Sequence, residues 1–453
     1  MKPLNPAFKS RLDKAADLVT ANRTDEAMPI VSDVLNQEPD CWQALYLAGT
    51  GFLKLEQPGL ATHCYKRVTE IVPGLPDAWN ALGRCYDQRG DYDTSEKMFR
   101  RVLMKDTKNP HALNNLGMTL MKKFRPKEAL VYFEKAREVK PDLRALDDNE
   151  ALARLCLKDW KNGWEQYDKG VGTSFDRKDR KYRGEPMWDG MPDRDIAIFT
   201  EQGLGDEIMF ASVIPDAIRD SRSVVIECDK RLKGLFHRSF NVPVYGARYN
   251  EDVDWLGKHN FTHRASVCSL PKFYRLTDDA FPGVPYLTAD PERRKMVRAL
   301  LDSLPGRKKV GLAWTGGRQA TGEGYRSVDL DQLKPLIDAF PDCSFVSLQY
   351  KKAEEKHGVR HFPYLTQTQD YDDTAALVAE LDAVVCVTTA VLHLSGALGK
   401  RAFCLVSDKP IWRYGAEGSE MVWYKSVSLH RQKQGDWKPA IESVIEGLKS
   451  WLA

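Results

Sequence analysis

A period of 34 residues runs through the first third of the chain and limits what this part can fold into. Three successive units begin at Trp42, Pro76 and Pro110, and each has small residues at its eighth and twentieth positions and an aromatic residue at its twenty-fourth. These residues are Gly49, Gly83 and Gly117; Ala61, Ser95 and Ala129; and Tyr65, Phe99 and Phe133. Small residues at these places let two antiparallel helices approach closely, and the aromatic side chain fills the gap to the neighbouring pair. The period therefore predicts stacked helix pairs.

The pattern resembles the tetratricopeptide repeat (TPR), because spacing and residue class agree in several registers at once. The matching units are 8–41, 42–75, 76–109 and 110–143, with a partial fifth unit at 144–170. Such arrays curve into a superhelix whose concave face suits an extended peptide. We expect a TPR α-solenoid over residues 1–170 that binds an acceptor protein or peptide. Alternatively, the array only supports the rest of the chain or forms a homodimer.

Composition excludes several classes of protein. The chain has 453 residues, 42% hydrophobic and 29% charged, and a formal net charge of +3, too small to indicate nucleic acid or a membrane surface as the partner. No apolar stretch reaches the ~18 residues of a membrane span, and the N-terminus lacks a signal-peptide core. The nine cysteines are scattered without a CxxC pair. We therefore expect a cytoplasmic protein without a zinc site or a disulfide framework.

Residues 171–194 are polar, basic and punctuated by glycine and proline, which predicts a surface linker. Trp188 is expected to pin this linker to one of the domains. We interpret its run of charged residues as solvated; alternatively, these residues border an anionic ligand.

A first α/β region is expected over residues 195–291. Its strand Asp195–Thr200 leads through a loop with Gly203 and Gly205 into a helix at about 207–219, so a ligand or another backbone can come close. Ile208 replaces the third glycine of a GxGxxG fingerprint, which argues against an NAD-dependent oxidoreductase. Asp206 is either an acid favoured by the helix dipole or a general base at the mouth of a cleft.

A second α/β region is expected over residues 292–453, ending in a helix at 438–452. Its first strand runs into a turn at Gly316, and Arg326 follows on a loop, as a phosphate ligand or in a surface salt bridge. The apolar strand 383–387 leads into Thr388, Thr389 and a helix that carries His393. This junction predicts an anion site at the carboxyl end of a sheet, although an ordinary capped strand–helix joint explains it equally well.

The order of motifs over nearly the whole chain resembles bacterial TPR-containing glycosyltransferases, whose C-terminal half is similar to heptosyltransferase-like enzymes of GT-B fold. The motifs are GLGDEIMFASVIP (203–215), VGLAWTGG (310–317), YRS (325–327), SLQ (347–349), VTTAVLHLSGALGK (387–400), IWRYG (411–415) and WYKSVSLHRQKQGDW (423–437). The resemblance implies an α + α/β chain, with a TPR α-solenoid followed by a GT-B fold of two Rossmann-like lobes. It places the acceptor on the lobe 195–291 and the nucleotide-sugar donor on the lobe 292–453.

The resemblance also implies roles for single residues. Asp206 matches the proposed catalytic base, and Arg326 matches the basic residue that grips the donor phosphate. Thr389 and His393 match an Asp-Thr-x-x-x-His segment at that phosphate, but Thr388 stands where the family usually has Asp, which leaves the donor open. Gln349 lies where the nucleotide would be bordered, and the glycine turns at Gly203, Gly205 and Gly316 complete the donor-binding set.

The expected activity is transfer of a sugar, with inversion, from a nucleotide sugar to a hydroxyl group of Ser or Thr on a flagellin-like protein. Hexosyl and nonulosonic-acid donors both remain open. No cofactor or metal is expected, because fixed donors and a cation can stabilise the leaving phosphate. The alternatives are a TPR adaptor with a degenerate GT-B module, and a transferase that acts on lipopolysaccharide or another glycan.

Overall fold

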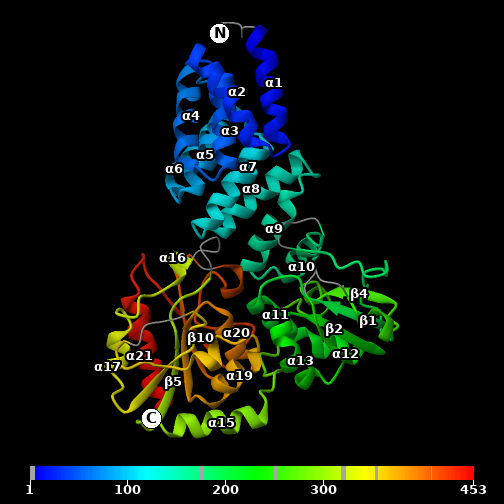
Figure 1. Ribbon diagram of the computed structural model, residues 1–453, viewed down its shortest axis with the longest axis vertical. Coiled ribbons are helices and arrows are strands. Elements are labelled where there is room, and N and C mark those ends of the chain that lie inside the picture. Colours follow the sequence, from blue (N-terminus) through cyan, green and yellow to red (C-terminus); the bar gives the residue numbers. More distant parts are fainter. Residues whose placement is uncertain (1–5, 173–176, 248–252, 318–322, 352–355, 410) are drawn as a thin grey trace. The chain divides into compact units, whose positions relative to one another are not determined.

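The chain forms two compact units, Met1–Ala153 and Arg154–Ala453. The computed structural model describes residues 6–172, 177–247, 253–317, 323–351, 356–409 and 411–453 (Figure 1). The first unit is helical, and the second contains two parallel sheets with helices.

Glycine–aromatic contacts hold the helix pairs of the first unit together. Its helices are α1 Pro6–Thr20, α2 Thr24–Gln37, α3 Trp42–Lys54, α4 Pro58–Ile71, α5 Pro76–Gln88, α6 Tyr92–Lys105, α7 Pro110–Lys122 and α8 Pro126–Val139. A Cβ atom added to Gly49 would lie 2.8 Å from the Tyr65 ring, and one added to Gly83 would lie 2.7 Å from the Phe99 ring. The aromatic ring therefore packs against the glycine of its own unit as well as filling the gap to the next pair, where Tyr65 shares a buried cluster with Leu82. The repeat pattern is confirmed, with this second contact added.

The two units divide inside helix α9 (Ala145–Cys156), and not after residue 170 as the repeat pattern suggested. The next helix, α10 (Trp160–Asp168), belongs to the second unit. There the indole N–H of Trp160 donates to Asp278 at 2.7 Å, and that of Trp164 donates to the Arg275 carbonyl at 2.8 Å. These tryptophans bond to residues far along the sequence, which periodicity alone does not reveal.

The first sheet is parallel with the order β3-β2-β1-β4. Its strands are β1 Asp195–Phe199, β2 Ser223–Cys228, β3 Val244–Gly246 and β4 His263–Ser266. Helices α11 (Leu204–Phe210) and α12 (Ile214–Asp220) replace the single helix expected at 207–219. A 3-10 turn at Ala211–Val213 separates them, because Pro215 lacks the N–H that would continue the α-helical hydrogen bonding.

The second sheet is also parallel, with the order β10-β9-β8-β5-β6-β7. Its strands are β5 Lys308–Ala313, β6 Cys343–Ser347, β7 Arg360–His361, β8 Ala383–Val387, β9 Ala402–Val406 and β10 Val427–Arg431. The chain order reverses between β5 and β8, and open α/β sheets of this kind bind ligands beyond the carboxyl ends of the strands at that point. The residues that follow β5 and β8 are therefore the natural place for a site.

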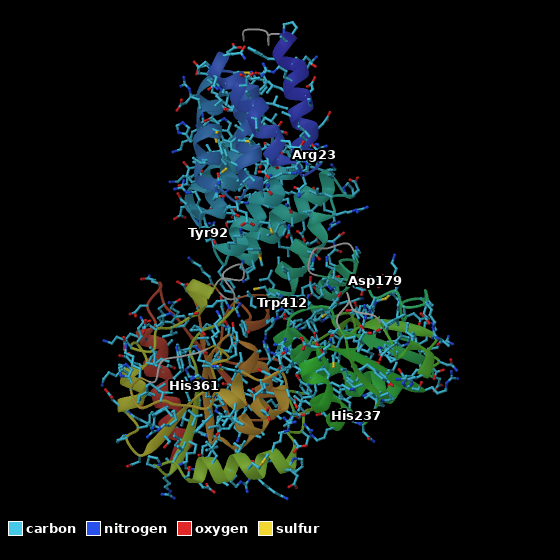
Figure 2. All side chains as sticks on the ribbon, viewed as in Figure 1. Arg23, Tyr92, Asp179, His237, His361 and Trp412 are labelled. Atoms are coloured by element: carbon cyan, nitrogen blue, oxygen red, sulfur yellow. The ribbon has the colours of Figure 1, made fainter. Side chains whose placement is uncertain are left out.

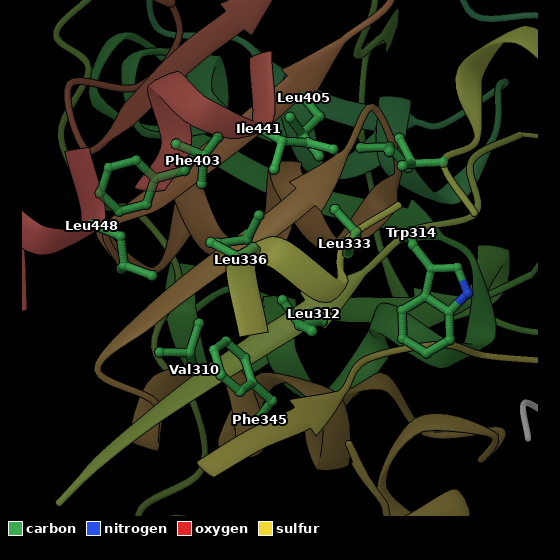
Figure 3. Close-up of a cluster of buried hydrophobic side chains, with 14 of the residues drawn as sticks. Val310, Leu312, Trp314, Leu333, Leu336, Phe345, Phe403, Leu405, Ile441 and Leu448 are labelled. Carbon is green, nitrogen blue, oxygen red and sulfur yellow. The ribbon is translucent and has the colours of Figure 1, made fainter. Parts of the chain in front are cut away.

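A hydrophobic core covers one face of this sheet (Figure 3). Strand side chains such as Leu312, Phe345 and Phe403 pack there with Ile441 and Leu448 of the terminal helix. The other helices of the second unit are α13 Lys233–Phe240, α14 Pro271–Tyr274, α15 Pro291–Asp302, α16 Glu323–Arg326, α17 Lys334–Asp338, α18 Pro363–Thr366, α19 Tyr371–Glu380, α20 Ala390–Ala397 and α21 Lys438–Leu452. The core anchors the strands whose carboxyl ends carry the candidate residues.

The segment expected as a solvated linker is in part buried. Arg177 is 1% exposed and pairs with Glu201 at 2.7 Å, and Arg180 pairs with buried Glu227 at 2.8 Å. Both carboxylates stand at or just after the carboxyl ends of strands in the first sheet. The interpretation of the charge run as solvated was therefore wrong here, because these guanidiniums compensate carboxylates at the sheet edge. Trp188 does pin the segment, since it is buried against Phe273.

Candidate functional site

Asp206 lies in the first turn of α11, just beyond the carboxyl end of β1. One of its carboxylate oxygens, Oδ1, forms an ion pair with the guanidinium of Arg413, which lies in the 3-10 turn Trp412–Tyr414 after β9. The Asp206 side chain is 23% exposed and the Arg413 side chain 12% exposed, so solvent still reaches the carboxylate. The motif IWRYG contains Arg413, but sequence reasoning gave this residue no role, because its partner lies 207 positions away.

His393 lies in α20 and is 4% exposed. Its Nδ1 atom is 3.3 Å from the Tyr424 hydroxyl, and its Nε2 atom is 3.3 Å from the Tyr414 hydroxyl. Burial, together with the positive charges of Arg413 and Arg326, lowers the pKa of His393 to about 3. The imidazole is therefore neutral near pH 7 and does not act as a cation.

Arg326 contacts the residue that stands in place of the family aspartate. Its Nε donates to the Thr388 hydroxyl at 3.0 Å, and its guanidinium also donates to the Thr388 carbonyl. Arg326 ends the short helix α16, so it does not lie on an open loop as the sequence suggested. The structure thus brings Arg326 to the carboxyl end of β8.

Thr389 occupies the N-cap position of α20 with an extended backbone, yet its side chain makes no capping hydrogen bond. The expected threonine cap was therefore wrong. Its carbonyl instead accepts a hydrogen bond from the Leu392 N–H at 3.0 Å. The side-chain hydroxyl is consequently not engaged as a cap on the helix that carries His393.

Two of the three candidate glycines lie in tightly packed places. A Cβ atom on Gly205 would lie 3.2 Å from the Ala390 Cα atom, because the start of α11 packs against the start of α20. A Cβ atom on Gly316 would lie 3.1 Å from the Thr388 carbonyl oxygen. Gly203 has more room, since its nearest neighbour would be Asp206 Oδ2 at 3.5 Å. Close approach of backbones thus accounts for Gly205 and Gly316 without a ligand.

Gln349 follows β6 and is 4% exposed. Its side-chain amide donates to the Thr315 hydroxyl at 2.7 Å, beside the glycine turn after β5. This bond tethers the two strand ends to each other. The nucleotide-bordering role of Gln349 stays a prediction.

An aromatic cluster supports the Arg413 turn, and its members are Trp164, Tyr167, Phe210, Trp412 and Trp423. The Trp412 ring lies 5.7 Å from the Trp164 ring in an edge-to-face arrangement (Figure 2 labels Trp412). Phe210, from the helix of Asp206, lies 6.4 Å from the Trp412 ring. The cluster therefore links α10, α11 and the Arg413 turn. The sequence shows these aromatics but not that they meet.

The site combines a carboxylate, two guanidiniums and a neutral imidazole between two tyrosine hydroxyls. Such a set can bind an anion and accept a proton. Among the described residues, no group of three or more potential metal ligands comes together, and no helix is both long and apolar enough to cross a membrane.

Known proteins resemble this chain in its repeats and, in one case, over most of its length. Residues 64–97 and 111–140 match family models described as tetratricopeptide repeat. Protein FlbA of Caulobacter vibrioides is 27% identical over an alignment 430 residues long, which covers 88% of this chain and 71% of FlbA. Anaphase-promoting complex subunit 3 of Schizosaccharomyces pombe is 25% identical over 109 residues, 24% of this chain and 16% of that protein.

Two solved structures are similar to part of the chain. The crystal structure of MamA matches with a TM-score of 0.31 and 17% identity, covering 34% of this chain and 91% of MamA. Pseudomonas aeruginosa pilF matches with a TM-score of 0.35 and 14% identity, covering 47% of this chain and 85% of the other. TPR repeats are thus confirmed by the family models at the residues that they match. The similarity to FlbA extends into both units, since 88% of the chain is more than either unit contains.

Proposed function

We propose that the unit Arg154–Ala453 is an inverting glycosyltransferase of GT-B arrangement that uses a nucleotide sugar. The observation that carries this proposal is the meeting of Asp206 and Arg413 beside His393 and Arg326. Asp206 follows the first strand of one sheet, while His393 and Arg326 lie beyond the carboxyl end of β8 in the other. These are the places where doubly wound sheets bind ligands.

In the proposed reaction, the oxygen of an acceptor hydroxyl attacks the anomeric carbon of the donor sugar. The bond between that carbon and the phosphate oxygen breaks, and its electron pair leaves with the phosphate. The hydroxyl proton passes to the carboxylate of Asp206, which acts as general base. The guanidiniums of Arg326 and Arg413 stabilise the negative charge that develops on the leaving phosphate.

We further propose that the TPR unit holds the acceptor, a protein with a reactive Ser or Thr. Two separate amide pairs join the first helices of neighbouring repeats, since Asn115 donates to Asn80 at 3.0 Å and Asn149 donates to Asn114 at 2.9 Å. Each side-chain amide has two N–H donors and an oxygen with two lone pairs, so these bonds leave capacity for an extended peptide backbone. A flagellin-like acceptor is the expected class.

The test uses the purified full-length chain with UDP-, GDP- and CMP-sugars, and measures nucleotide release and transfer to protein. We expect Asp206→Asn to lower turnover by about 100-fold or more and to keep nucleotide binding, because the base but not the phosphate site is removed. Arg326→Ala should weaken binding of the nucleotide. The control is Arg298→Gln, which breaks the exposed pair of Arg298 with Glu380 elsewhere in the unit. If calorimetry detects no nucleotide binding by the wild-type chain, the enzyme proposal fails.

The second candidate is a TPR adaptor with an inactive α/β unit. It is favoured by the finding that packing alone accounts for Gly205 and Gly316, and by Thr388 in the place of the family aspartate. An adaptor would retain a polypeptide on the TPR unit and bind none of the nucleotides. The same calorimetry therefore separates the two candidates.

A further inference from the structure

We propose that Arg413 exchanges between two partners, the carboxylate of Asp206 in the free protein and the donor phosphate in the complex. Donor binding would then release the general base at the moment when it is needed. This inference rests on the proposed function and adds to it an exchange of partners and an order of events: the donor binds first, and the acceptor is deprotonated afterwards.

The Asp206–Arg413 pair leaves hydrogen-bonding capacity on the guanidinium. Arg413 binds one oxygen of Asp206 through one terminal nitrogen, whereas a bidentate pair would use two parallel N–H groups. Its Nε–H is buried and has no hydrogen-bond partner among the described residues. A guanidinium has five N–H donors, so Arg413 carries donors that this carboxylate does not satisfy. A phosphate, with more oxygens and more negative charge, could satisfy them.

The location of Arg413 suits a second cationic ligand for a phosphate, beside Arg326. The next residue, Tyr414, approaches the Nε2 atom of His393 at 3.3 Å, so the Arg413 turn borders the helix that follows β8. Arg326 lies at the end of the same strand, in contact with Thr388. The charges of both arginines act on His393. Two cations therefore stand around one neutral imidazole, which suits an anion with several oxygens.

The backbone that carries Arg413 is held firmly, so the exchange would take place in the side chain. Arg431, at the end of β10, donates to the Tyr414 carbonyl at 2.6 Å and to the Gly418 carbonyl at 2.7 Å. The Trp412 ring is fixed in the aromatic cluster, and the guanidinium of Arg413 lies 5.2 Å from its centre. A long side chain on a fixed turn can change partners without moving the fold.

The exchange makes the Asp206 carboxylate available as a base when the donor phosphate is bound. In the free protein, Asp206 Oδ1 is occupied by Arg413, so the carboxylate is less available to an acceptor proton. Once the phosphate takes the guanidinium, Asp206 can accept the hydroxyl proton while the C–O bond to phosphate breaks. Arg413 then neutralises charge on the phosphate that leaves with the electron pair.

The test measures binding of UDP, GDP, CMP and inorganic pyrophosphate to full-length variants by calorimetry. Asp206→Asn should bind the preferred probe about tenfold more tightly than wild type, because the carboxylate that competes with the phosphate for Arg413 is gone. Arg413→Gln should bind it about tenfold more weakly, since a charge-assisted bond to phosphate is lost. In the double variant, Asp206→Asn should add no tightening to Arg413→Gln. Arg298→Gln serves as the control with unchanged affinity.

The outcomes separate this inference from the proposed function. If wild type binds a probe and Asp206→Asn binds it equally well or more weakly, the exchange is refuted while the transferase proposal stands. If no variant binds any probe, both fail. If thermal unfolding shows that Arg413→Gln does not fold, Arg413→Lys replaces it. Arg413→Lys keeps the positive charge and should bind the probe more tightly than Arg326→Ala does. The result with Asp206→Asn remains decisive by itself.

Discussion

Glu96 of helix α6 provides a direct test of the electrostatics of the TPR unit. It is 9% exposed and lies 2.8 Å from Arg100, 2.7 Å from Lys123 and 3.1 Å from Arg125. Burial by itself would raise the pKa of Glu96, but hydrogen bonds from Lys123 and Arg100 and the nearby charges lower the pKa to about 2. Relative to the ordinary glutamate pKa of about 4.3, the shift corresponds to roughly 3 kcal/mol of stability at pH 7.

The sign follows from the lowered pKa. The stabilisation is complete above the unfolded-state pKa and is lost as pH falls from about 5 towards 2. We expect Glu96→Gln to destabilise the repeats by about 2–3 kcal/mol at pH 7, since it removes the charge that three cations share. Hydrogen exchange of α6–α8 amides in the full-length chain measures this, as roughly 30-fold or more loss of protection for amides that exchange by unfolding of these helices.

The matched control is Glu70→Gln, which breaks a pair between Arg67 and a carboxylate that is 62% exposed. Exposed pairs contribute about 0–1 kcal/mol, so this variant should change protection little. Equal effects of the two substitutions would refute the argument that burial makes the Glu96 network important. The argument would also be refuted if the free energy of urea unfolding of the wild-type repeats were the same at pH 7 and at pH 3.

Three further tests concern packing, protonation and the extent of the second unit. Gly83→Ala should destabilise the repeats by about 1–3 kcal/mol because the new methyl group meets a phenylalanine ring, whereas Gly59→Ala, with open space around it, should stabilise by up to about 1 kcal/mol in urea unfolding. The His393 imidazole should stay neutral from pH 8 to pH 5 because burial lowers its pKa; ring ¹⁵N NMR shifts that titrate near pH 6.5 would contradict this. A fragment 154–453 should be soluble and unfold cooperatively on heating. A fragment 195–453 should not, because it lacks Arg177 and Arg180 and so leaves the buried carboxylates of Glu201 and Glu227 unpaired. Equal thermal unfolding of the two fragments would disprove this role of residues 171–194.

Much of the local structure could be predicted from the sequence. The 34-residue period located the helix pairs because helix packing repeats the same contact, glycine against aromatic, in each unit. The strand Ala383–Val387 and the terminal helix Lys438–Leu452 occur at the predicted residues. The strand follows from a continuous apolar run and the helix from apolar side chains at helical spacing, and both are properties of neighbours in the sequence.

The candidate site was predicted only in part. Asp206, Arg326 and His393 were singled out from their places after strands and glycine turns and from the family resemblance, and their functional roles stay predictions. Arg413 was missed as a partner of Asp206, and the neutral state of His393 was not foreseen. The first depends on a contact across the fold, and the second on burial, so neither has a local signal.

The sequence by itself determined the repeating helices, the two strand–helix regions and the residues able to carry acid–base chemistry. Tertiary structure alone decided which of them meet. Helix α10 belongs to the second unit because of the contacts of Trp160 and Trp164. Arg177 is buried against Glu201, and Asp206 pairs with Arg413. The physical reason is that periodicity is fixed by neighbouring residues, whereas ion pairs and burial depend on the distances that folding creates between residues far apart in the chain.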